Sequence, residues 1–155
     1  MDKLKISTAN LVILVAGGVM LIASFLAFHK LPVPSFDIGG QTVGGGTKSY
    51  NAWSTGHFLI ATIPALLGTV MALHVALETY APQVSLPDRV LGFTWTQVHL
   101  ILALQATVMM LAFLIQNFSP LDRGIGLYLM LISAIALLVG AVMRMQQKPD
   151  TRPFG

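Results

Sequence analysis

Four long apolar runs occupy most of this 155-residue sequence and restrict what it can fold into. A helix needs about 20 residues to cross the hydrocarbon core of a bilayer, and in that core every backbone polar group must find its partner within the protein. None of the runs shows the alternating pattern of a transmembrane β-strand. We therefore predict membrane-spanning helices over residues 10–28, 58–80, 93–116 and 125–143.

The composition agrees with a membrane protein. Only 10% of the residues are charged, against about 25% in soluble domains. The chain has no cysteine, which excludes disulfides, thiolate nucleophiles and thiolate metal sites. Its net charge of +3 is small and no basic run is dense, so nucleic acid is not an expected partner. The lipid bilayer is an expected partner. The sequence predicts one membrane domain over residues 1–155.

The connections and the small residues indicate how the spans pack. Short connections at 81–92 and 117–124 make neighbouring spans adjacent and antiparallel. The expected fold class is therefore an all-α integral membrane protein, a four-transmembrane-helix antiparallel bundle. Small residues let helices approach closely in lipid, and they recur on one face of the second and fourth spans: Ala61, Ala65, Gly68, Ala72 and Ala76, then Ser133, Ala136 and Gly140.

Lysine and arginine indicate the orientation. Six lie on the side that holds both termini: Lys3, Lys5, Arg89, Arg144, Lys148 and Arg152. Three lie on the other side: Lys30, Lys48 and Arg123. Because cytoplasmic segments carry the excess of positive charge, we predict that both termini and the tail 144–155 are cytoplasmic, in the inner membrane of a bacterium. The long loop 29–57 is then outside the cell.

The outer loop contains the stretch GGQTVGGGTKSYNAWSTGH, residues 39–57. In one interpretation it is a tether, in which Trp53 lies at the headgroups and Asn51 caps the second span. In the other, Tyr50, Asn51 and Trp53 form a partner-binding surface. We expect no strand before the glycines, which excludes a phosphate-binding loop, and we expect Gly44 to Gly46 to let the loop fold back over the bundle.

Chemistry at membrane depth is restricted to a few polar side chains. His74, Glu78 and His99 lie near the cytoplasmic ends of the second and third spans. They could bind a divalent metal, His74 and His99 could ligate a haem iron, or the histidines could pair with Glu78 or reach water. His74 lies about 180° from Ala65 around the helix. It therefore points away from the small-residue face, and we favour the last interpretation, with no cofactor and no catalytic residue.

Gln105 lies near the middle of the third span. We expect its amide to form a hydrogen bond to a neighbouring helix. Since no ionisable residue lies at the midplane, transport by a single chain is disfavoured. An oligomeric channel or transporter component remains an alternative.

Two segments resemble a known group of proteins. SYNAWSTGHFLIATIPALLGTVMALHVAL, residues 49–77, and GAVMRMQQK, residues 140–148, are similar to small actinobacterial four-span membrane proteins of unassigned function with an Asn-Ala-Trp motif in the outer loop. The resemblance implies a multi-pass envelope protein and no enzyme activity. The expected function is an accessory or structural subunit of a larger membrane complex, or a homo-oligomer. Its partner-binding candidates are Tyr50, Asn51, Trp53, Ala136 and Gly140.

Overall fold

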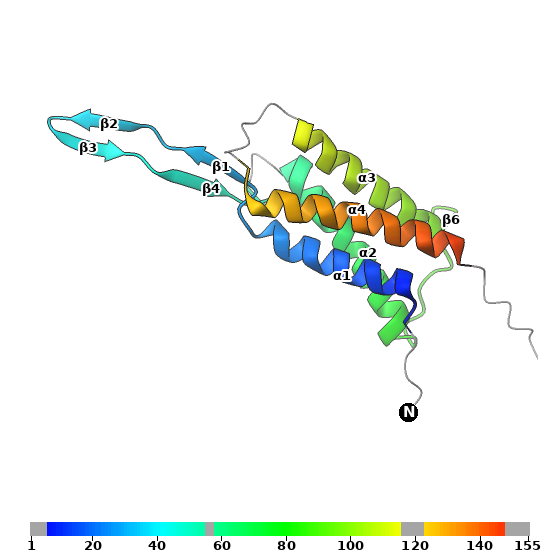
Figure 1. Cartoon of the computed structure of the whole chain (residues 1–155). Helices are drawn as coiled ribbons and strands as arrows, with labels where there is room; N and C mark the ends of the chain where they lie inside the picture. The colour runs from blue at the N-terminus through cyan, green and yellow to red at the C-terminus, as the bar shows by residue number, and fades with distance from the viewer. Residues whose placement is uncertain (1–5, 55–57, 116–122, 148–155) are drawn as a thin grey trace, which may run out of the picture.

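The computed structural model describes residues 6–54, 58–115 and 123–147. Over these ranges the chain forms a bundle of four antiparallel α-helices with a long β-ribbon at one end (Figure 1). A short π-helical turn, η2 (Phe58–Thr62), precedes the second helix. The helices are α1 (Thr8–Ser24), α2 (Ile63–Tyr80), α3 (Trp95–Ile115) and α4 (Ile125–Gln146).

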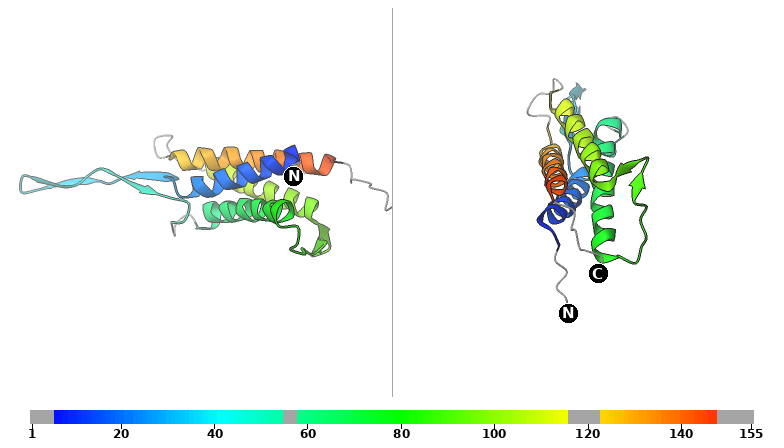
Figure 2. Two further views of the ribbon diagram at one scale, coloured as in Figure 1. Left: turned by 90° about the horizontal axis from the view of Figure 1, so that it is seen from below. Right: turned by 90° about the vertical axis from the view of Figure 1, so that its right-hand side faces the viewer.

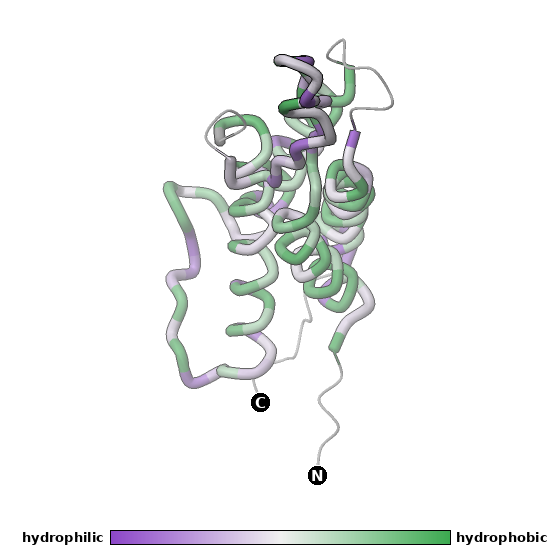
Figure 3. The backbone as a smooth tube through the Cα atoms, turned by 90° about the vertical axis from the view of Figure 1, so that its left-hand side faces the viewer, coloured by the Kyte–Doolittle hydropathy of each residue, from purple (hydrophilic) through white to green (hydrophobic). Residues whose placement is uncertain are grey.

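Three helical segments are long and apolar enough to cross a membrane: Leu59–Tyr80, Trp95–Ile115 and Ile125–Gln146. Figure 3 shows how apolar residues follow the helical parts of the backbone. Helix α1 is also apolar but has 17 residues, about 25 Å at 1.5 Å per residue. The prediction of a mostly helical chain is confirmed over the described residues, and its three long apolar helices and one shorter one are compatible with a membrane protein.

The predicted first span, 10–28, is wrong at its carboxyl end. Helix α1 ends at Ser24 and the chain enters a strand at His29. The reason is a change of hydrogen-bond partner: the Phe28 amide donates to the Tyr50 carbonyl at 2.7 Å. Apolar character alone therefore extends the helix too far, because Phe25 to Phe28 are apolar but not helical.

Helix α1 packs against two neighbours. It contacts α2 and α4, and α3 contacts the same two helices. Gly17 faces α2 so closely that an added Cβ would lie 2.6 Å from both the Gly68 oxygen and the Ala72 Cβ. At Gly140 of α4, an added Cβ would lie 2.8 Å from Ile13. The small residues of α2 and α4 are thus used inside the bundle, and the expected close packing is confirmed.

The start of α4 is also in backbone contact with the segment that follows α1. The amides of Gly124 and Gly126 donate to the carbonyls of Phe28 and Ala27, at 3.0 and 2.9 Å. A Cβ on Gly124 would collide with the Ala27 carbonyl. Glycine is required here because the two backbones touch, and the contact fixes where the chain leaves α1 for the ribbon.

Four short strands form the ribbon. β1 (His29–Pro32) pairs with β4 (Thr47–Tyr50), and β2 (Ser35–Ile38) pairs with β3 (Gln41–Gly44), both antiparallel. The ribbon projects from the bundle end opposite the start of α1 and the end of α4, roughly along the bundle axis (Figures 1 and 2). Its ten residues from His29 to Ile38 cover about 33 Å at 3.3 Å per residue.

The ribbon corrects two expectations about the outer loop. A strand, β2, does precede the glycines, and the loop extends away from the bundle instead of folding back over it. Gly39 and Gly40 have φ of +64° and +85°, as a two-residue hairpin turn requires. The Asp37 carboxylate accepts from the Gly40 amide at 3.1 Å. Gly39 and Gly40 therefore form the turn of a hairpin and do not make this loop a flexible linker.

The connection between α2 and α3 holds a second, smaller hairpin. β5 (Arg89–Val90) pairs with β6 (Phe93–Thr94) around a turn at Leu91 and Gly92, both with positive φ. It lies at the end of the bundle opposite the ribbon (Figure 2).

Adjacent glycines of α1 allow a matched test of the packing. We expect Gly17→Ala to destabilise the bundle by about 1–3 kcal/mol, the usual cost of overpacking, because the neighbouring Gly68 oxygen is backbone and cannot rotate away. Gly18→Ala is the control, since nothing lies within 4 Å of its added Cβ. Thermal unfolding in mild detergent measures both. Equal melting temperatures for the two variants would contradict the packing described here.

Candidate functional site

A cluster of polar and aromatic side chains lies at the end of the bundle that holds both described chain ends. His74 and Glu78 come from the last turns of α2, Trp95 and His99 from the start of α3, and Arg144 from the last turn of α4. The connection at 81–94 joins the end of α2 to the start of α3, so the fold brings these turns together. His74, Glu78 and His99 were predicted from the sequence; Trp95 and Arg144 complete the site.

The two histidines are in contact. The His74 ring stacks on Trp95, with ring centroids 3.8 Å apart and planes 28° apart. It meets His99 edge to face, with centroids 4.9 Å apart. Both histidines are buried. His74 is therefore buried and in contact with His99 although it lies about 180° from Ala65 of the small-residue face. In a ring of four helices α2 has two neighbours, α1 and α3, so it buries two faces and not one.

Arg144 connects all three helices of the cluster. Its guanidinium donates to Glu78 Oε2 at 2.5 Å and lies 3.5 Å from His99 Nδ1. The Arg144 side chain is 11% exposed and that of Glu78 is 44% exposed. A nearly buried cation is thus paired with a carboxylate that reaches the surface. The position suits a cation, because the carboxyl end of a helix carries partial negative charge.

The geometry gives no support to the metal and haem hypotheses. His74 Nδ1 and His99 Nε2 find no hydrogen-bond partner among the described residues. Those same residues, however, contain no group of three His, Cys, Asp or Glu side chains that could hold a metal ion. Ligation of one haem by both histidines needs the two imidazoles on opposite sides of the porphyrin, whereas these rings touch edge to face. Both hypotheses stay predictions.

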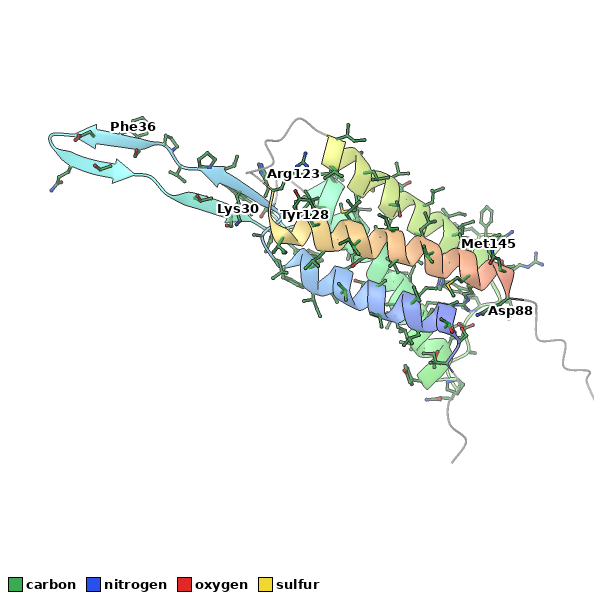
Figure 4. All side chains as sticks on the ribbon, in the orientation of Figure 1. Lys30, Phe36, Asp88, Arg123, Tyr128 and Met145 are labelled. Atoms are coloured by element: carbon green, nitrogen blue, oxygen red, sulfur yellow. The ribbon has the colours of Figure 1, made fainter. Side chains whose placement is uncertain are left out.

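A cleft of about 320 Å³ opens beside the cluster. Its volume is within the range of small-molecule sites. Trp95 Nε1 donates to the Pro87 carbonyl at 2.7 Å, which ties the wall of the cleft to the start of α3. Figure 4 shows Asp88 at this end of the molecule. The lining residues are His74, Glu78, Pro82, Val84, Leu86, Pro87, Asp88 and Trp95.

At the opposite end, the Asn-Ala-Trp motif, residues 51–53, attaches the base of the ribbon to the bundle. We call this attachment the Trp53 clasp. Trp53 Nε1 donates to Ser24 Oγ at 2.8 Å, and its ring stacks on Phe25. The Thr62 hydroxyl donates to the carbonyl of the buried Ala52 at 2.6 Å. The motif thus ties the chain to α1 and to η2, and whether Trp53 also lies at the lipid headgroups stays a prediction.

Asn51 and Tyr50 have local roles in this clasp. Asn51 Oδ1 accepts from the Trp53 amide at 3.1 Å, so it stabilises the turn that follows the ribbon and does not cap α2. Tyr50 lies opposite His29 in the β1–β4 pair. Whether Tyr50, Asn51 or Trp53 also contacts a partner stays a prediction.

The two candidates on α4 have different surroundings. Gly140 is buried against α1. Ala136 lines a shallow apolar groove of about 390 Å³ between α1 and α4, together with Ser133. Partner binding by either residue stays a prediction.

Comparisons with protein-family models, with curated proteins and with solved structures found no match for this chain. The resemblance based on the Asn-Ala-Trp motif therefore stays a prediction. The function proposed below rests on the sequence and on the geometry of the described residues.

Because Arg144 and Glu78 are unequally exposed, we predict that removing one of them costs more stability than removing the other. Glu78→Met leaves the nearly buried Arg144 without its counter-charge, so we expect a loss of roughly 1–2 kcal/mol, less than the 3–5 of a fully buried pair. Arg144→Met should cost less, because the remaining Glu78 reaches the surface. The double variant should regain part of the loss. Melting temperatures in one detergent measure the series, and a costlier Arg144→Met would contradict this account.

Proposed function

We propose that this protein is a non-catalytic accessory subunit of a bacterial inner membrane that crosses the bilayer four times and binds a partner protein outside the cell through its ribbon. Three helices have the length and hydropathy of membrane spans. The shorter α1 is followed by four apolar residues, 25–28, which continue the apolar run outside the helix. The positive-inside bias of lysine and arginine supports cytoplasmic termini, and the ribbon at the opposite end is then outside.

The proposal depends on the apolar face of the ribbon. Phe36 lies directly opposite Val43 in the β2–β3 register, and Ile38 lies two residues further along, on the same face. These side chains are 62%, 53% and 68% exposed. Figure 4 shows Phe36 far from the helices. The other face presents polar residues, including the cross-strand pair Asp37 and Thr42.

This arrangement is typical of a binding element. Contiguous exposed apolar residues rimmed by polar ones mark interaction surfaces, and an isolated two-stranded hairpin is marginally stable in water. A partner that covers the apolar face, or adds a strand to a free edge, would stabilise the ribbon. Because the ribbon reaches beyond the bundle end (Figure 2), the partner's contact surface lies outside the bilayer. This supports an accessory role without a catalytic site.

Site-specific photocrosslinking tests the proposal. A photoreactive residue at Phe36 or Val43 should give a discrete protein adduct in native membranes, because these side chains face the partner. The same probe at Asp37 or Thr42 is the matched control, one residue away on the polar face, and should give at most about a tenth of the adduct. Equal adducts from both faces, or adducts with lipid alone, would refute partner binding by this face.

The redox alternative has its own measurement. The edge-to-face contact of His74 and His99 leads us to expect an absorbance spectrum of the purified protein without haem bands between about 400 and 560 nm. A Soret band in protein purified from haem-replete cells would contradict this expectation and favour a redox subunit. His74→Phe is the control, since it should remove any such band.

A further inference from the structure

Gln105 is a polar residue at a position where a membrane-spanning helix is expected to carry an apolar one. It is the central residue of α3, with ten helical residues on either side, and its side chain is exposed on the outside of the bundle. The other exposed polar residues of the described helices all lie within four residues of a helix end: Thr8, Glu78, Tyr80, Gln97, Tyr128 and Gln146. Gln105 alone would lie at the middle of the bilayer, facing outward.

The side-chain amide of Gln105 has no hydrogen-bond partner among the described residues. No hydrogen bond joins its side chain to the residues that the structure describes, so the expected bond to a neighbouring helix of the bundle is absent from that part of the chain. In hydrocarbon an amide without a partner costs several kcal/mol. A polar group at this depth is retained when it pairs with another polar group.

The surroundings of Gln105 form a seam suited to another helix. Exposed residues of α3 follow at spacings of four, three, four and three: Ile101, Gln105, Val108, Ala112 and Ile115. This is the heptad spacing along which parallel helices pack. Small Ala112 allows close approach, and β-branched residues occupy every seventh position. The outward faces of the other helices have similar spacing, so the spacing alone does not show which helix packs against another. The amide at the centre of the seam distinguishes α3 from them.

We propose that the protein is a homodimer in which the α3 helices of two copies pack along this seam and the two Gln105 amides form reciprocal hydrogen bonds. An amide both donates and accepts, so it complements a copy of itself. Two copies in one membrane share their orientation, and a two-fold axis along the membrane normal places each residue of α3 opposite its own counterpart. A single polar residue in such a seam also fixes the register.

This inference rests on the membrane placement in the proposed function, and not on the partner of the ribbon. The seam lies along α3, whereas the ribbon leaves the bundle from α1. The two interactions can therefore be lost separately.

Cysteine crosslinking tests the seam directly, since the chain has no cysteine of its own. Val108→Cys should form a covalent dimer in membranes treated with a membrane-permeant oxidant. Ile135→Cys, on the outward face of α4, is the matched control: both residues are β-branched, near mid-helix and similarly exposed, at 53% and 45%. Equal crosslinking of the two variants, no dimer from Val108→Cys, or adducts only with another protein would overturn the proposal.

A second measurement isolates the amide. Energy transfer between labelled copies in lipid vesicles reports the dimer affinity, and Gln105→Leu should weaken it about threefold to tenfold, as expected for an interhelical hydrogen bond. Gln105→Asn keeps the amide and should weaken it less. An unchanged affinity for Gln105→Leu would overturn the role of the amide. Carbonate extraction of the same membranes checks insertion: release of the chain would refute the membrane placement, and with it both proposals.

Discussion

The close approach of α1, and of the segment that follows it, to α2 and α4 is the constraint on which the rest of the structure depends. Side chains are missing at Gly17, Gly124 and Gly140, where an added Cβ would collide with the neighbouring segment. In lipid there is little hydrophobic gain from bringing helices together, so packing must supply the cohesion. The absence of side chains at these positions therefore determines both the arrangement of the bundle and the point at which the ribbon begins.

The two ends of the bundle are stabilised in different ways. At the ribbon end, hydrogen bonds of Trp53 and Thr62 and the amides at the start of α4 join neighbouring segments. At the other end, Arg144 joins three helices through charge and ring contacts. The ribbon end presents an element to the surroundings, and the Arg144 end forms a cleft whose polar side chains already contact one another.

The helices could be predicted from the sequence because hydropathy is summed over about 20 residues, so single residues matter little. The ribbon was missed because its strands have four residues each and its glycines are equally typical of a linker. Ser-Phe-Asp-Ile followed by Gly-Gly does carry the alternation and turn of a hairpin. The sequence raised a meeting of His74 and His99 but disfavoured it, because helical periodicity shows which residues share a face and not how many faces a helix buries.

The way the ribbon is attached has a mechanical consequence. Its first strand continues from α1, whereas its last strand leads through the Trp53 clasp to α2. A force applied at the tip is therefore divided between two helices that touch at Gly17. Tilting the ribbon would displace one of these helices along the other, so the position of the ribbon and the packing of α1 against α2 are mechanically coupled.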